Sequence, residues 1–493
     1  MRFHQFHPAG TLAIWFGMAA TSQADLTLNY DFTPNLTVTD NGQVSSVQTL
    51  GGLSGLTSIT DVNVRLDLTS RNAAEPMYLG DLYASLTLGT FSEAYRSTVL
   101  LNRPGRSDTD AFGSALSSLN VILDDSATTN VWAATSNTGT YQADGRLTVN
   151  PNTTGVGFVN GTHGLSALDG SVPASDRVSL LVADYSQGGI ATLASWGLSV
   201  TGTINSGSVF TPGANASISD AGTGSINTIS STLNTTGAAV GGLLLDLAGI
   251  TTFSSAVTGT GGLNMAGSGS AILEGTNTYS GITHISSGTL LVNGTNSGGG
   301  AVDVGAAGKL GGHGSIAGAV TVDSGGTLSP GASIATLTSG ALTLNAGSTF
   351  AFELNSASHS ADLQVVNGNL TLDSSDGHKV YLTVADLADT PTAFTGTLSL
   401  INYAGAFSGG FFTYVDAENV QTSLGEGAQF TLGANTWKIT YTATAGGLNV
   451  PGGSTGHFIN LSNLTAVPEP GSWLALGCLV GCGAFMRSRR SGA

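Results

Sequence analysis

The sequence predicts an all-β protein: a β-sandwich, then a parallel stack of β-coils, then one C-terminal apolar helix. Apolar and polar residues alternate with a period of two through most of the 493 residues, as they do in strands with one buried face. Glycine is abundant, at 71 residues, and it separates short apolar runs instead of forming a low-complexity tract. Short units recur at intervals of about 20 residues, which is typical of stacked coils.

Residues 1–24 are expected to be a signal peptide. Arg2 precedes an apolar run at residues 12–20, and small residues follow at Ser22 and Ala24. A basic start, a short apolar core and small residues at the cleavage point are typical of a secretory leader. We therefore expect cleavage between Ala24 and Asp25 and export of the remaining chain.

Residues 25–203 predict a β-sandwich of ordinary domain size. The segment holds seven of the eleven arginines, and no stretch in it shows the 3.6-residue period of a helix. Turn-forming residues separate its stretches of alternating apolar and polar residues. The clearest alternating stretches are residues 62–68, 82–88, 178–182 and 198–200.

Short motifs in this sandwich carry a family resemblance. An aspartate, Asp184, ends one expected strand, and Trp196-Gly197-Leu198 opens the last. With residues 59–64, 79–86 and 98–101, this resembles the P domain that follows the catalytic domain of proprotein convertases. The Gly-Thr-Trp usual in that family is replaced by residues 176–178, and no protease domain precedes the segment in this sequence. The resemblance implies a jelly-roll-like sandwich used for stability or binding, and it does not imply proteolysis.

Four aspartates in the sandwich leave two interpretations open. Asp81 and Asp184, with Asp124 and Asp125, are candidate ligands for Ca²⁺, which takes six to eight converging oxygen atoms. Alternatively they cap turns and solvate strand edges, as an aspartate beside a glycine usually does. We favour turn capping, and Ca²⁺ is the one cofactor that the sequence brings into question.

Residues 204–350 predict a β-solenoid. Arginine disappears here, glycine rises, and one unit combines Asn277-Thr278-Tyr279-Ser280-Gly281 with Gly288-Thr289-Leu290. This unit resembles the autotransporter-associated β-strand repeat, which implies coils of parallel strands. We expect Tyr279 in the coil interior and glycines at corners where a Cβ would clash. Asn277 is expected at a turn; the alternative is an inward amide that pairs with its neighbours.

Residues 351–450 are expected to form a β-rich cap on the coils, because an open coil end exposes unpaired backbone. A loose linker is expected at residues 451–466, which begin with Pro-Gly-Gly-Ser.

Residues 467–493 predict a sorting signal. Pro468, Glu469 and Pro470 precede an apolar segment at residues 473–486, and a basic tail follows with Arg487, Arg489 and Arg490. As a helix the apolar segment is about 21 Å long, short of the ~30 Å hydrocarbon core, and the arginines favour a stop-transfer role. The order resembles the PEP-CTERM signal of Gram-negative bacteria, read by exosortase-type membrane peptidases. It implies transient anchoring of a transmembrane helix in the inner membrane and delivery to the cell surface or extracellular matrix; an ordinary tail anchor is the alternative.

The composition of the chain disfavours nucleic-acid binding and catalysis. A net charge of −17 makes nucleic acid a poor partner, because phosphate binding needs clustered cations. The histidines lie in no recognisable catalytic motif, and from residue 205 to 450 the cations are three lysines. We expect a secreted, non-catalytic structural or adhesion protein whose polar faces suit an extracellular polysaccharide or envelope polymer. The alternative is a β-helix enzyme, a lyase or hydrolase, that degrades polysaccharide.

Overall fold

The computed structural model describes residues 25–464, apart from residues 72–75, 91–94, 107–109, 111, 135, 147–163, 205–206, 208, 215, 221–224, 375–378, 434 and 453. In this part the all-β prediction is confirmed: the elements are strands and four short 3₁₀ turns, without an α-helix. None of its helical segments has the length and apolarity needed to cross a membrane. The expected leader, sorting motif, apolar helix and basic tail lie outside the described residues, and so do Ala24, Pro468, Glu469, Pro470, Arg487, Arg489 and Arg490.

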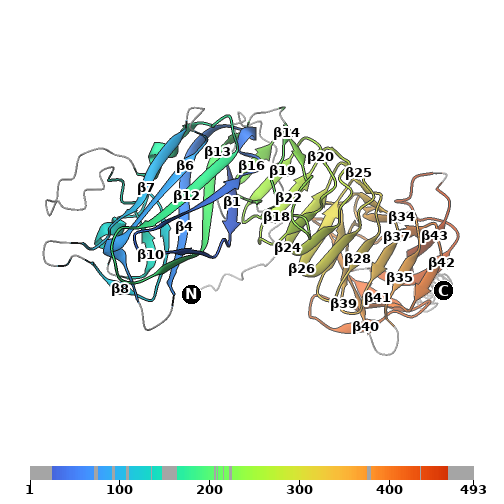
Figure 1. Ribbon diagram of the computed structural model, residues 1–493. Helices are drawn as coiled ribbons and strands as arrows, with labels where there is room; N and C mark the ends of the chain where they lie inside the picture. The colour runs from blue at the N-terminus through green and yellow to red at the C-terminus, as the bar shows by residue number, and fades with distance from the viewer. Residues whose placement is uncertain are drawn as a thin grey trace, which may run out of the picture.

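The N-terminal part consists of two β-sheets packed face to face (Figure 1). In spatial order, the strands of one sheet are β10 (Thr138–Tyr141), β9 (Ser118–Leu123), β4 (Leu56–Ser70), β13 (Ala191–Ile204) and β1 (Asp25–Phe32). Those of the other are β3 (Gln43–Thr49), β12 (Arg177–Asp184), β6 (Leu82–Leu88) and β7 (Arg96–Asn102). Trp196 fills the space between the sheets, fully buried, and its indole N–H donates to Ser46 Oγ at 3.0 Å.

Strand β1 joins the two halves of the molecule. Its residues pair with β13 on one side and with β15 (Ala216–Ser219) on the other, both antiparallel. Asn29 adds side-chain hydrogen bonds in both directions, donating to Ser219 Oγ at 2.9 Å and accepting from Ser199 Oγ at 2.6 Å. The sandwich sheet therefore continues directly into the second half and covers what would be an open strand edge.

Beyond β15, short strands stack in parallel and form three ladders (Figure 1). Ladder 1 contains β15, β18 (Leu243–Asp246), β21 (Leu263–Met265), β24 (Thr283–Val292), β26 (Val302–Gly312), β28 (Val320–Val322), β31 (Leu342–Leu344), β35 (Leu370–Leu372) and β38 (Phe407–Gly409). Ladder 2 contains β16 (Ile226–Ile229), β19 (Ile250–Phe253), β22 (Ser270–Leu273), the second halves of β24 and β26, β29 (Thr327–Pro330), β32 (Thr349–Asn355), β36 (Val380–Asp386) and β39 (Phe412–Val415). Ladder 3 consists of two sheets in succession, which meet where the Thr278 N–H donates to the Val257 carbonyl at 2.8 Å. The first contains β14 (Val209–Phe210), β17 (Thr232–Asn234) and β20 (Val257–Thr258). The second contains β23 (Thr276–Asn277), β25 (Thr295–Asn296), β27 (Ser315–Ile316), β30 (Thr336–Ser339), β34 (Leu363–Val366) and β37 (Thr397–Tyr403).

Glycine at the corner before ladder 1 lets successive turns of the chain lie in contact. A Cβ built on Gly262 would lie 1.7 Å from the carbonyl oxygen of Ile282, and one on Gly300 would lie 2.1 Å from that of Gly281. No side chain fits at such distances, because real Cβ atoms stay beyond 3.0 Å. The glycine periodicity in the sequence therefore reflects backbone-to-backbone packing between neighbouring turns.

Parallel pairing does not stop at residue 350, where the sequence predicted the cap to begin. It continues through β39, and the antiparallel end comes later, with β40 (Gln421–Ser423), β41 (Gln429–Leu432), β42 (Asn435–Ala443) and β43 (His457–Asn463). The expected linker at residues 451–466 is also wrong, because it contains β43. Phe458, Ile459 and Leu461 of this strand are buried, so it folds as part of the core.

Aromatic side chains close the C-terminal end of the ladders. The hydroxyl of Tyr441, on β42, accepts a hydrogen bond from the Phe412 N–H and donates one to the Leu424 carbonyl, both at 2.8 Å. Its ring stacks on Phe407, with the centroids 6.0 Å apart. Strands from antiparallel sheets therefore lie against both ends of ladder 1. Strand β1 pairs with its first strand, and Tyr441 of β42 packs on its last.

Candidate binding surface

The residues of the repeat motif build the interior of one turn of the chain. Tyr279 is buried, and its hydroxyl lies 2.8 Å from Thr283 Oγ1 and accepts from Asn296 Nδ2 at 2.9 Å. Leu290 is also fully buried, while Thr289 faces outward beside it in β24. Thr278 contributes its N–H, which donates to the Val257 carbonyl at 2.8 Å.

The glycines of the motif occupy corners. Gly288 has φ +72°, a left-handed conformation that glycine adopts without strain. A Cβ on Gly281 would lie 2.3 Å from the backbone nitrogen of Gly262. These residues shape the stack and carry no chemistry of their own.

The expectation that Asn277 occupies a turn is wrong. The side chain is fully buried in β23, with Oδ1 accepting from the Val257 N–H at 2.8 Å and Nδ2 donating to the Gly275 carbonyl at 3.2 Å. Its amide therefore satisfies the backbone of the preceding turn of the chain. A buried amide is tolerated here because these two partners replace the hydrogen bonds that water would make.

Asp81 and Asp184 lie side by side, since the Tyr185 N–H donates to the Asp81 carbonyl at 2.9 Å. Both side chains are buried. Burial raises the pKa of Asp184 to about 6, and the nearby charges of Asp81 and Asp40 add to the rise. Arg103 Nη2 approaches Asp81 Oδ1 at 3.7 Å.

Asp124 and Asp125 lie in a different place, where they cap backbone N–H groups. Asp125 accepts from Leu165 at 3.0 Å and from Ser166 at 2.6 Å, and Asp124 accepts from Ser126 at 2.7 Å. The four aspartates considered for Ca²⁺ are therefore split between two sites. Over the described residues, histidine, cysteine, aspartate and glutamate side chains form no group of three or more that could hold a metal ion.

The outer face of ladder 1 carries a feature that sequence reasoning missed. One outward position is occupied by a hydrogen-bonding side chain in seven successive strands, from β21 to β38. We call this set the ladder-1 column: Asn264, His284, Asp303, Thr321, Thr343, Thr371 and Ser408. Neighbours in a parallel ladder are about 4.8 Å apart, so the column is a regular row of polar groups.

Contacts along the column link its members. Nδ1 of His284 lies 3.5 Å from Oδ2 of Asp303, and the hydroxyls of Thr371 and Ser408 are 3.0 Å apart. Two residues further along, just past the ends of β28 and β31, Asn345 Nδ2 donates to Asp323 Oδ1 at 2.8 Å. This contact, which we call the Asp323–Asn345 pair, widens the polar surface beside Thr321 and Thr343.

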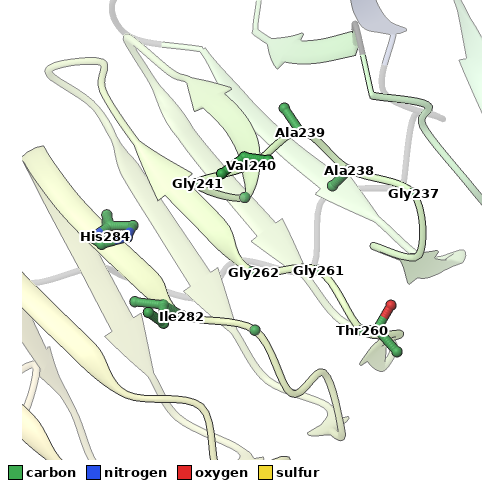
Figure 2. Close-up of a pocket in the computed structure, with 12 residues that line it drawn as sticks. Gly237, Ala238, Ala239, Val240, Gly241, Thr260, Gly261, Gly262, Ile282 and His284 are labelled. Atoms are coloured by element: carbon green, nitrogen blue, oxygen red, sulfur yellow. The ribbon is translucent and has the colours of Figure 1, made fainter.

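A shallow hollow of about 470 Å³ adjoins the column at His284 (Figure 2). Its floor is glycine backbone, including Gly261, Gly262 and Gly281, and Val240 and Ile282 contribute exposed aliphatic side chains. His284 is the one titratable residue that lines it.

The outer face of ladder 2 differs in chemistry. Its corresponding row begins with Ile226 and Ile250, and from β22 to β36 it is polar: Ser270, Thr289, Lys309, Thr327, Thr349 and Tyr381. Over the same turns the two rows differ in charge, because on β26 ladder 2 carries Lys309 and the ladder-1 column carries Asp303.

Similarity to known proteins covers a small part of the chain. A stretch of 82 residues, 16% of this chain, is 38% identical to the adhesin BmaC autotransporter of Brucella suis biovar 1 (strain 1330) and covers 2% of that protein. The chain thus spans only a very small share of that adhesin's length. No family model matches the chain, so the resemblances to the P domain and to the PEP-CTERM signal stay predictions.

Proposed function

We propose that this protein is an exported, non-catalytic adhesion or structural protein of the cell surface or extracellular matrix. The observation that carries the proposal is the ladder-1 column, a long, regular polar surface borne on stacked strands. The partial similarity to an autotransporter adhesin supports it. The scarcity of cations along the stack speaks against the alternative, a polysaccharide-degrading β-helix enzyme, because such chemistry usually needs a positive group to stabilise developing charge.

We further propose that the three ladders wind as one β-solenoid, with the sandwich as a P-domain-like, jelly-roll-like module at its start. Successive strands visit ladder 1, ladder 2 and ladder 3 in the same order through most of the stack. A solenoid of this kind would act as a rigid spacer, because each turn contacts only its neighbours.

For export and sorting, we propose cleavage between Ala24 and Asp25 and recognition of Pro468, Glu469 and Pro470 by an exosortase-type peptidase. Prolines keep such a stretch extended and open to a protease. The apolar segment and Arg487, Arg489 and Arg490 would hold it at the inner membrane before processing. Replacing the three motif residues with alanine should leave an unprocessed, membrane-bound form, and normal processing of that variant would refute the assignment.

The function is tested by incubating the purified mature protein with neutral and acidic polysaccharides while binding and product release are both measured. The proposal predicts retention of glycan or envelope polymer without new reducing ends or unsaturated products. Saturable cleavage of any of these polymers would contradict it and favour the enzyme.

A further inference from the structure

We propose that the ladder-1 column is the binding site of an uncharged, extended polysaccharide chain that lies along the stack of strands. This inference rests on the proposed adhesion function and names the class of partner and the face that binds it.

The column repeats at a spacing that an extended glycan can follow. Thr321, Thr343 and Thr371 are direct register partners in β28, β31 and β35, so their hydroxyls recur at about 4.8 Å. An extended β-linked glycan advances by a comparable distance per sugar and presents hydroxyls at every step. Each sugar can therefore hydrogen-bond to one strand, so the number of hydrogen bonds grows with the length of the glycan.

The hydroxyls of the column are held in place before any ligand arrives. A β-branched side chain in a strand has few χ1 rotamers, so threonine loses little conformational entropy on binding. Thr371 and Ser408 are also ordered by their mutual hydrogen bond at 3.0 Å. Preorganised donors at fixed intervals favour a ligand that is itself regular.

The Asp323–Asn345 pair gives the surface the width of a sugar ring beside Thr321 and Thr343. It lies two residues from the column, about 7 Å along the strand, and its members are joined at 2.8 Å. A carboxylate and an amide together can accept from and donate to neighbouring sugar hydroxyls, and hydrogen bonds to a carboxylate are stronger than neutral ones.

The negative charge of this surface favours an uncharged polymer as the ligand. The column and the Asp323–Asn345 pair carry the carboxylates of Asp303 and Asp323 and include no lysine or arginine, and the net charge of the chain is −17. A polyanion would therefore be repelled. Lys309 faces outward on ladder 2, in register with Thr289 and Thr327, and so belongs to a different face.

The hollow beside His284 extends the same surface at one end. Because its floor is glycine backbone, a ligand can approach closely there. Val240 and Ile282 offer aliphatic contact for the C–H face of a sugar (Figure 2).

The test is isothermal titration of the full mature chain with uncharged β-1,4-linked glucose oligosaccharides of increasing length. Affinity should grow with length, whereas helical α-1,4-linked oligosaccharides and a polyuronate should bind at least tenfold more weakly. Thr343→Val removes one column hydroxyl at nearly constant shape and should weaken binding about fivefold, equivalent to about 1 kcal/mol. The matched control is Thr349→Val on the outer face of ladder 2, which should bind as the parent does.

Equal weakening by both variants, or unchanged binding by Thr343→Val, would overturn the assignment to this face. Absence of binding to every uncharged oligosaccharide would overturn the ligand class. Neither result overturns the export or the absence of catalysis in the proposed function, which fail instead if the oligosaccharides are cleaved or if immunolabelling finds the protein only inside the cell.

Discussion

The sandwich and the ladders are held together in opposite ways. In the sandwich, partners come from distant parts of the chain: β1 pairs with β13, and β4 with β13, across more than a hundred residues. In the ladders, most partners are one turn of the chain apart, as with Leu263 and Thr283. The sandwich should therefore respond to core damage as a unit, while the ladders should respond mainly near the altered turn.

The largest effect is expected from emptying the sandwich core at Trp196. Trp196→Ala removes the largest buried side chain, its contact with Phe32 of β1 (ring centroids 4.6 Å apart), and the hydrogen bond to Ser46. The free energy of unfolding should fall by about 3–5 kcal/mol, measured by urea denaturation. A loss confined to tenths of a kilocalorie would show that the two sheets do not share one core.

A smaller but still large effect is expected from a glycine corner. Gly300→Ala places a Cβ 2.1 Å from the Gly281 carbonyl oxygen, so the backbone must shift at a cost of about 2–3 kcal/mol. Hydrogen exchange should show the loss of protection concentrated in β24, β26 and β28. Gly425→Ala, where a Cβ meets nothing within 4 Å, is the matched control and should leave stability unchanged.

Asn277→Ala should destabilise the ladders by about 1–3 kcal/mol, because the Val257 N–H then loses its acceptor inside the core. Urea denaturation, as for Trp196→Ala, measures this loss in the free energy of unfolding. If Asn277 occupied an exposed turn instead, the change would stay within about 0.5 kcal/mol.

The smallest effect is a pH dependence of the sandwich. Because the pKa of Asp184 in the folded protein is raised to about 6 by burial and by the charges of Asp81 and Asp40, the folded state binds the proton more tightly than the unfolded state. Asp184 therefore contributes stability at low pH that is lost as pH rises from about 4 to 6. Asp184→Asn should reduce the pH dependence of the unfolding midpoint over that window without abolishing it, because the pKa of Asp169 is also raised to about 6 by burial; an unchanged pH dependence would contradict the raised pKa of Asp184.

The sequence predicted the parts of this fold that repeat and missed those that depend on register. Glycine corners and an interior Tyr279 follow from local spacing, because each turn of the chain obeys the same steric limits. The direction of Asn277 was wrong, since side-chain direction in a two-residue strand depends on its pairing with β25. Strand β43 was missed because the Pro-Gly-Gly run at residues 451–453, just before it, suggested a linker.

The candidate site lay beyond prediction for a similar reason. The intervals between its members are 18 to 22 residues from Asn264 to Thr343, but 28 residues from Thr343 to Thr371 and 37 from Thr371 to Ser408. The period of about 20 residues is therefore lost in the last strands, where loops of unequal length still bring the members into one row. Strand β1, likewise, gives no local sign that it pairs on both sides.

The register of ladder 1 supports both the column and the proposed function, and cysteine crosslinking tests it most directly. With Cys478 and Cys482 replaced by serine, the chain has no other thiol. Thr321→Cys with Thr343→Cys should form a disulfide on mild oxidation, because these residues are register partners and neighbouring strands lie about 4.8 Å apart, within the Cα separation that a disulfide spans. Thr321→Cys with Thr371→Cys, one strand further apart, should stay reduced; crosslinking of this second pair, or failure of the first, would contradict the account.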